Sequence, residues 1–378
     1  MKLSHFTLIE QFLNDNYNIT GPHTIKDDVV DVDGTVKVKN RELESLTNGI
    51  FRFGIITHRF HCINCPNLVS LEGAPRKVGE CFSCCFCSKL TSLEGAPEEV
   101  GESFWCNSCT NLTSLEGSPK KVGGRFDCAE CPNLISLEGA PEEVNEDFGC
   151  GGCKNLKSLK GAPREVGGDF NCGVCPKLTS LEGAPKKAGG GFYCYSCPNL
   201  KTLEGAPKYV GENFDCSECY RLTSLEGAPK EVNENFWCLS CVNLISLEGA
   251  PKRARKNFDC SGCPKLTSLK GAPEEVGGDF WCNNCHNLNT LGGAPKEVGG
   301  VFSCAFCPNL KSLEGGPERV DGDFNCFACS SLTSLEGAPK EVGGNFDCAE
   351  CDNLIITSND KEKYKIQTKI KQVNYETS

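Results

Sequence analysis

Long apolar runs are missing from the sequence, and methionine and tryptophan are scarce. Among 378 residues there are one Met and three Trp. No stretch approaches the roughly 20 consecutive apolar residues that a membrane-spanning helix needs. Glu10 and Gln11 also interrupt the apolar residues near the N-terminus, where a signal peptide would require an unbroken apolar segment. We therefore expect no membrane partner and a cytoplasmic location.

The motifs of common enzyme chemistry are absent as well. No Gly-rich phosphate loop joins a strand to a helix, and no Gly-x-Ser-x-Gly nucleophile motif occurs. There are only five His, and none of them recurs periodically. An excess of acidic residues gives a net charge of −11, which repels the phosphates of nucleic acids. The sequence thus predicts a protein that is not an enzyme, has no cofactor and binds no nucleic acid.

What the sequence does contain is a repeat of 22 residues without insertions or deletions. A Phe begins each regular copy, and positions are numbered from it, so that plus one is the next residue. Cys follows at plus two and plus five, which accounts for 28 of the 30 Cys, and Leu follows at plus eight in every copy and at plus eleven in all copies but the last. The repeat Phe residues stand at positions 60, 82, 104, 126, 148, 170, 192, 214, 236, 258, 280, 302, 324 and 346.

This spacing predicts a solenoid. Phe and the first Cys are two residues apart, so they lie on one face of a short strand and enter a shared core. Gly and Pro form the corners, and the return path from the Pro to the next Phe has no amphipathic helical pattern. We expect that return path to be extended or made of turns.

The pattern Phe-x-Cys-x-x-Cys-x-x-Leu-Thr-Ser-Leu-Glu-Gly-Ala-Pro resembles the cysteine form of the leucine-rich repeat over residues 34–356. It is particularly similar to repeat proteins of large tailed bacteriophages and giant viruses. The resemblance implies a β-rich, leucine-rich-repeat-like solenoid of 14 regular 22-residue coils, with short parallel strands and little helix. It implies a recognition surface without standard chemistry, and a virion is the alternative to the host cytoplasm.

The ends of the chain depart from the repeat. Residues 1–33 are predicted to form an N-terminal cap, with a short helix over 6–16 and a strand at 29–32 followed by a hairpin turn at Asp33-Gly34. Residues 34–59 are predicted to form a degenerate first coil, in which Val36 stands at the position that Phe60 has in the next coil. The regular repeats occupy 60–356, and 357–378 form a C-terminal cap or tail.

The cysteines are predicted to be reduced, metal-free packing residues. In-register neighbours keep Cβ atoms about 4.8 Å apart, whereas a disulfide needs about 3.8 Å. A metal- or redox-active thiol protein is the less favoured alternative. Two local candidates remain for it: Cys81 and Cys85, expected to face solvent, and His58 and His61 beside the Cys62/Cys65 pair.

The binding surface is predicted on the strand side, where minus one, plus one and plus three should face solvent. Copies diverge there, and we expect that packing does not dictate the plus-one column. Its aromatic and acidic residues predict a protein partner with a basic patch. The alternative is a structural or adhesin component of a phage virion that binds host surface carbohydrate. The predicted binding residues are Trp105, Tyr193, Tyr195, Trp237, Asp259, Trp281, Phe306 and Phe327.

Overall fold

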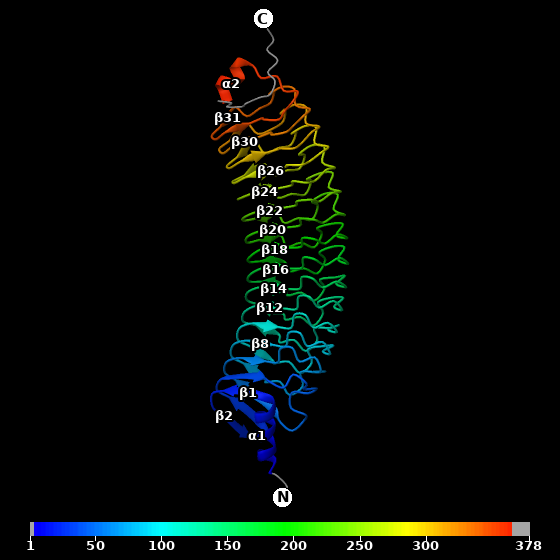
Figure 1. Ribbon diagram of the computed structural model, residues 1–378, viewed down its shortest axis with the longest axis vertical. Coiled ribbons are helices and arrows are strands. Elements are labelled where there is room, and N and C mark those ends of the chain that lie inside the picture. Colours follow the sequence, from blue (N-terminus) through cyan, green and yellow to red (C-terminus); the bar gives the residue numbers. More distant parts are fainter. Residues whose placement is uncertain (1–3, 365–378) are drawn as a thin grey trace. The chain divides into compact units, whose positions relative to one another are not determined.

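The computed structural model describes residues 4–364. The chain divides into two compact units, Met1–Gly190 and Gly191–Ser378, which are described separately. In each unit, every regular coil contributes one two-residue strand at the repeat Phe, and every regular coil except the last contributes a second one that ends at plus eighteen, usually a Val. Equivalent strands of successive coils pair in parallel, forming a Phe sheet and a Val sheet (Figure 1). The chain is therefore a β-solenoid with a 22-residue period and little helix, as predicted.

The Phe sheet and the Val sheet of unit 1 are as follows. The Phe sheet contains β1 (Tyr17–Thr20), β4 (Thr35–Val38), β6 (Phe60–His61), β8 (Phe82–Ser83), β10 (Phe104–Trp105), β12 (Phe126–Asp127), β14 (Phe148–Gly149) and β16 (Phe170–Asn171). The Val sheet contains β2 (His23–Lys26), β3 (Val29–Val32), β5 (Arg52–Ile56), β7 (Lys77–Val78), β9 (Glu99–Val100), β11 (Lys121–Val122), β13 (Glu143–Val144), β15 (Glu165–Val166) and β17 (Lys187–Ala188).

Unit 2 repeats the same arrangement. Its Phe sheet contains β18 (Phe192–Tyr193), β20 (Phe214–Asp215), β22 (Phe236–Trp237), β24 (Phe258–Asp259), β26 (Phe280–Trp281), β28 (Phe302–Ser303), β30 (Phe324–Asn325) and β32 (Phe346–Asp347). Its Val sheet contains β19 (Tyr209–Val210), β21 (Glu231–Val232), β23 (Arg253–Ala254), β25 (Glu275–Val276), β27 (Glu297–Val298), β29 (Arg319–Val320) and β31 (Glu341–Val342). The sequence analysis identified the return path as extended but did not identify it as a second sheet.

The core of each unit is a column of stacked Phe rings. Successive ring centroids in unit 2 lie 4.9–5.7 Å apart, with interplanar angles of 6–24°. The parallel strands set this spacing, because neighbouring strands lie about 4.8 Å apart. Both Leu columns are buried beside the rings. Burial of each such side chain contributes roughly 1.5–3 kcal/mol.

The glycine at plus thirteen is required by the turn and by the close approach of the preceding coil. Gly117 has φ +91°, and a Cβ there would lie 2.4 Å from the carbonyl carbon of Leu93. Backbone strain of this kind costs about 1–3 kcal/mol per residue, before the clash is added. The other coils repeat the same geometry, which explains why the Gly recurs.

We expect Gly117→Ala to lower the free energy of unfolding by about 2 kcal/mol or more. Urea denaturation followed by circular dichroism measures the change. Gly49→Ala is the matched control, because Gly49 also has a positive φ of +68° but nothing lies within 4 Å of its added Cβ. The control should cost clearly less, and equal costs would contradict the close-approach argument.

The N-terminal segment contains a helix and two antiparallel strand pairs. The helix α1 (His5–Asn16) begins after Ser4, whose side chain accepts a hydrogen bond from the Thr7 amide. β2 pairs with β3, and β1 pairs with β4. The predicted hairpin turn at Asp33-Gly34 was wrong, because this corner connects the Val sheet to the Phe sheet. The hairpin turn is formed instead by Asp27 and Asp28, both with positive φ.

Aromatic residues cover both ends of the Phe columns. In unit 1, Val36 pairs with Phe60, and the rings of Tyr17 and Phe53 pack edge-on at 5.2 Å. In unit 2, the helix α2 (Ser358–Tyr364) places Tyr364 against Phe346, with ring centroids 4.6 Å apart. The remainder of the predicted cap or tail, residues 365–378, lies outside the described residues.

Candidate functional site

Aromatic and acidic residues alternate along the plus-one column of unit 2. Parallel pairing places Tyr193 beside Asp215, Asp215 beside Trp237, Trp237 beside Asp259, and Asp259 beside Trp281. We call these five residues the aromatic–acidic strip. All five side chains are half-buried, so the sequence-based expectation that this column faces solvent openly needs correction. In unit 1, Trp105 lies between Ser83 and Asp127 in the equivalent column.

The acidic and amide side chains at plus one have a structural role that the sequence analysis missed. Their Oδ1 atoms accept a hydrogen bond from the backbone N–H at plus three of the same coil, as from Ser261 to Asp259 at 2.8 Å. The prediction that packing does not dictate this column was therefore wrong for these residues. The side chains concerned are those of Asp127, Asn171, Asp215, Asp259, Asn325 and Asp347.

The Trp residues of the strip have no such acceptor, and the preceding coil supplies it instead. The N–H of Leu239, in the Trp237 coil, donates to Ser217 Oγ at 3.2 Å. The N–H of Asn283, in the Trp281 coil, donates to Ser261 Oγ at 3.1 Å. The alternation of Asp-x-Ser coils with Trp coils thus satisfies every one of these four turns. Local backbone hydrogen bonding does not require an indole at either position.

The two aspartates of the strip are partly withdrawn from water. Burial raises the pKa of both Asp215 and Asp259, and the hydrogen bonds from Ser217 and Ser261 oppose that shift. A carboxylate in this setting has lost part of its hydration and gains from a nearby cation. The strip therefore offers two under-hydrated carboxylates between aromatic rings, which are also favourable surfaces for a cation.

The minus-one column carries acidic residues that connect neighbouring coils. Asp279 Oδ1 accepts the N–H of Val301 at 2.7 Å, and Asp323 Oδ1 accepts the N–H of Asn345 at 2.6 Å. Asn257 Oδ1 does the same for the N–H of Asp279 at 2.8 Å. Negative charge on the strand side is therefore partly a consequence of short acceptor side chains that the backbone needs.

The remaining predicted binding residues lie at the end of the strands. Tyr195 is half-buried at plus three. Phe306 and Phe327, on successive coils, pack edge-on with ring centroids 5.3 Å apart. Phe306 is 48% exposed and has φ +58°. The left-handed conformation of the plus-four column was not predicted, because the residues in that column range from Gly to Phe.

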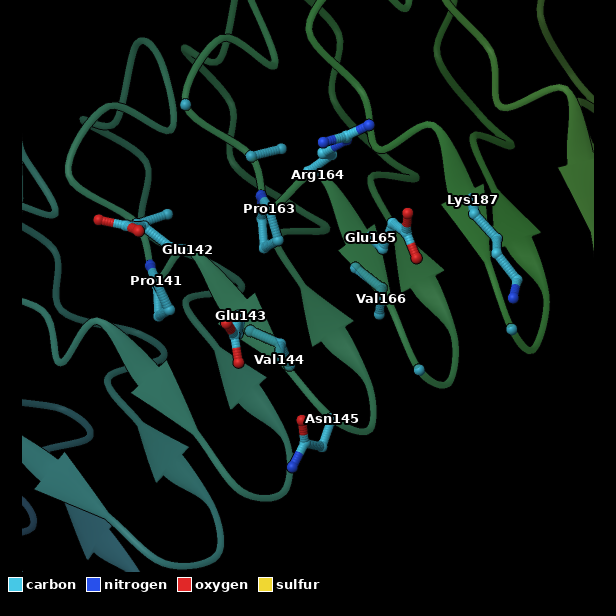
Figure 2. A pocket seen from close by; sticks show the side chains of 15 residues that line it. Pro141, Glu142, Glu143, Val144, Asn145, Pro163, Arg164, Glu165, Val166 and Lys187 are labelled. Carbon is cyan, nitrogen blue, oxygen red and sulfur yellow. The ribbon is translucent and has the colours of Figure 1, made fainter.

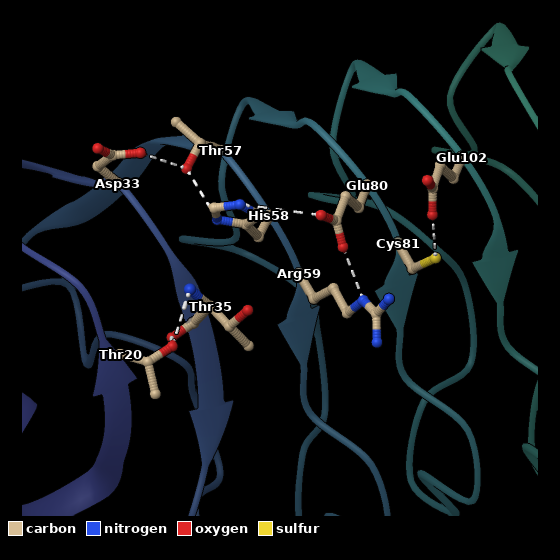
Figure 3. Close-up of polar contacts among 9 residues, drawn as sticks. All are labelled: Thr20, Asp33, Thr35, Thr57, His58, Arg59, Glu80, Cys81 and Glu102. Carbon is tan, nitrogen blue, oxygen red and sulfur yellow. Dashed lines mark hydrogen bonds and ion pairs between the residues drawn. The ribbon is translucent and has the colours of Figure 1, made fainter.

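Both thiols outside the repeat positions are buried, so the prediction that they face solvent was wrong. Cys81 is 6% exposed and Cys85 is 7% exposed. The Cys81 thiol donates to the Glu102 carboxylate at 3.2 Å (Figure 3), and the Cys85 thiol donates to Asn107 Oδ1 at 2.7 Å. The physical reason is the tight stacking of coils, in which a longer side chain of the next coil covers a small one.

The repeat thiols form two buried columns that donate to backbone carbonyls. The second Cys donates to the carbonyl of the first Cys in the preceding coil, as from Cys241 to Cys216 at 3.3 Å. The first Cys donates forward, as from Cys216 to the Trp237 carbonyl at 3.5 Å. Burial raises the pKa of most of these thiols, for example to about 12 for Cys285. The columns therefore serve packing and backbone hydrogen bonding.

The histidine cluster considered as a metal site is not assembled. His58 is exposed and contacts Thr57 and Glu80 (Figure 3). His61 is half-buried, and burial lowers its pKa. Within residues 4–364, no group of three or more His, Cys, Asp or Glu side chains is arranged to hold a metal ion.

The stacked coils with their two parallel sheets define a β-solenoid repeat protein. Its fold is similar to that of a leucine-rich repeat protein from Bacteroides ovatus, with a TM-score of 0.50 and 13% sequence identity over 94% of this chain and 96% of that chain. A scan against protein-family models found no match, and a search of curated proteins found none either. Over the part of the chain that the structure describes, no helix is long and apolar enough to cross a membrane.

Proposed function

We propose that this chain is a non-catalytic recognition scaffold whose aromatic–acidic strip binds a protein segment rich in Arg or Lys. The alternation of Tyr193, Asp215, Trp237, Asp259 and Trp281 on successive strands carries the proposal. Five strands about 4.8 Å apart span roughly 19 Å, the length of about six extended residues. A basic segment of that length can place cations beside both carboxylates.

The energetics of the strip favour a cationic ligand. Burial has already removed part of the hydration of Asp215 and Asp259, so docking a cation there costs less further desolvation of the carboxylates. Guanidinium and ammonium groups also bind to the faces of Trp and Tyr rings. The net charge of −11 adds a long-range attraction that speeds encounter with a basic partner.

The test is the double variant Asp215→Asn/Asp259→Asn, assayed with a fluorescein-labelled octa-arginine peptide by fluorescence anisotropy. Asn retains the oxygen that accepts the Ser217 and Ser261 amides but has no charge. We expect binding at pH 7 to weaken at least about fivefold, and Glu142→Gln/Glu143→Gln, with the same charge change on the Val sheet, to have little effect. Equal losses of affinity in both variants would mean that binding depends on net charge alone, and this would contradict the proposal.

The same double variant, Asp215→Asn/Asp259→Asn, should bind more weakly but be more stable at neutral pH. The folded-state pKa of each Asp is raised, so ionisation at neutral pH costs stability, and this cost disappears as the pH falls below the ordinary Asp pKa of about 3.9. The Asn variant should therefore melt slightly higher than the parent protein at pH 7, and the two should converge in acid. A lower melting temperature at pH 7 would show that the carboxylates are stabilising.

The alternative is a carbohydrate ligand on a virion adhesin, since Trp faces with adjacent carboxylates also suit sugar rings. Salt separates the two, because a cationic segment is screened and an uncharged glycan is not. Octa-arginine binding should weaken severalfold between about 50 and 300 mM NaCl. Salt-independent capture on an array of neutral glycans, with no octa-arginine binding, would favour the alternative.

A further inference from the structure

On the Val sheet of unit 2, the coils of β21 and β23 enclose a hollow of about 620 Å³. Small apolar residues line it, namely Ala228, Pro229, Val232, Ala250 and Pro251. Around them are Lys230, Lys252, Arg253 and Arg255, with Glu231 as the single acidic lining residue. We call this site the basic hollow. Its volume falls within the range of small-molecule sites, about 300–1,000 Å³.

The fold does not require this concentration of positive charge. Equivalent hollows recur where other coils bring the same Ala-Pro corners together. The one of about 800 Å³ in unit 1 (Figure 2) is lined by Glu142, Glu143 and Glu165 against Arg164 and Lys187. The one of about 540 Å³ in unit 2 is lined by Glu274, Glu275 and Glu297 against Lys296. The basic hollow therefore has an excess of positive charge, whereas the other two hollows have an excess of negative charge on the same backbone.

The charge arises from a local departure from the repeat. Residues 252–256 read Lys-Arg-Ala-Arg-Lys. Every other regular coil except the last has Gly, Asn or Asp at the position of Arg255, and Gly or Glu at the position of Lys256. The neighbouring coils have Asn233-Glu234 and Gly277-Gly278 at these positions, so the turn itself does not require a basic run.

The cations are available to a ligand. Arg253 pairs with Glu275 at 3.2 Å and Lys252 with Glu274 at 3.7 Å, but the two basic side chains are 72% and 86% exposed. Exposed pairs of this kind contribute about 0–1 kcal/mol and exchange readily. Among the described residues, Arg255 and Lys230 make no ion pair.

We propose that the basic hollow binds a small molecule carrying two or more adjacent phosphate groups. Arg253 and Arg255 supply planar, fork-shaped donors that match phosphate oxygens, and Lys230 and Lys252 add point charges from two coils. The proposal is independent of the strip, because it concerns the other sheet and the opposite charge. The phosphates come from an inorganic polyphosphate or from a nucleotide.

The test is isothermal titration of the full chain at about 50 mM NaCl with tripolyphosphate and, separately, with adenosine triphosphate. We expect about one saturable site per chain. Arg253→Glu/Arg255→Gly places residues that neighbouring coils already have, Glu275 and Gly277, so the fold should persist. This variant should bind at least tenfold more weakly. Arg76→Gly/Lys77→Glu, with the same charge change in unit 1, should lose no more than about twofold.

Arg253→Lys/Arg255→Lys keeps the charge and removes the fork geometry, so it should lose about threefold or more. Equal affinity for the two probes identifies the phosphates alone as the ligand, and tenfold tighter binding of the nucleotide identifies a nucleotide. No saturable binding, an equal loss in the Arg76→Gly/Lys77→Glu control, or tighter binding of single-stranded oligonucleotides that grows with their length would each overturn the proposal.

Discussion

Native protein is expected to leave its 30 thiols almost unreacted with iodoacetamide under conditions that fully alkylate the urea-unfolded chain. All 30 are buried and free, none more than 7% exposed. Burial also raises the pKa of most of them, for example that of Cys85 to about 11 and that of Cys153 to about 12. Because the thiolate is the nucleophile, alkylation should be slowed at least about 1,000-fold, the factor set by a local opening of about 4 kcal/mol.

Mass spectrometry of alkylated peptides after timed exposure at pH 8 measures this protection coil by coil. Cys348 and Cys351, in the last regular coil, should react first because that coil has no regular coil after it. Cys81 and Cys85 should be protected like the repeat thiols. Native protein that carries about one zinc or iron per Cys-x-x-Cys pair, or that alkylates rapidly in the middle coils, would contradict the packing role.

The repeat made the core of the fold predictable, because packing fixes both residue type and spacing. Phe, two Cys and two Leu recur at constant intervals, and their burial follows from a strand and its corner. The Val sheet was not predicted, since each of its strands in the regular coils has only two residues and one inward side chain, too short for a periodic pattern. The hairpin turn was misplaced for a related reason: Asp33-Gly34 has a turn sequence, but its neighbours pair with other strands.

The candidate site was only partly predictable, because its residues have structural roles that sequence divergence conceals. The plus-one position that Asp259 occupies varies among copies, as a binding position would. Yet the Asp259 carboxylate also accepts a hydrogen bond from the Ser261 N–H. In the Trp237 coil, the N–H of Leu239 finds its acceptor in Ser217 of the preceding coil. This hydrogen bond depends on two coils at once, so comparing the copies one column at a time does not detect it. The burial of Cys85 depends likewise on the following coil. Such inter-coil contacts depend on how the side chains of two stacked coils meet, which the repeat pattern does not specify.

Replacing both Trp237 and Trp281 with Ala is expected to weaken octa-arginine binding at least tenfold and to move the melting temperature by only a few degrees. An interface Trp commonly contributes about 2 kcal/mol or more, roughly thirtyfold in affinity. The fold should tolerate the change because both indoles lie outside the Phe column. The turns of both coils also keep their acceptors, Ser217 and Ser261.

Trp105→Ala is the matched control, because Trp105 occupies the same repeat position in unit 1 but, unlike Trp237, has Ser83 instead of a second Asp on one side. If the strip is the site, this variant should bind octa-arginine within about twofold of the parent protein. A loss equal to that of the double variant would mean that the whole strand face binds without a defined strip. Unchanged binding in the double variant, together with a large fall in melting temperature, would mean that the two indoles serve the core, and the recognition function would then have to lie elsewhere on the solenoid.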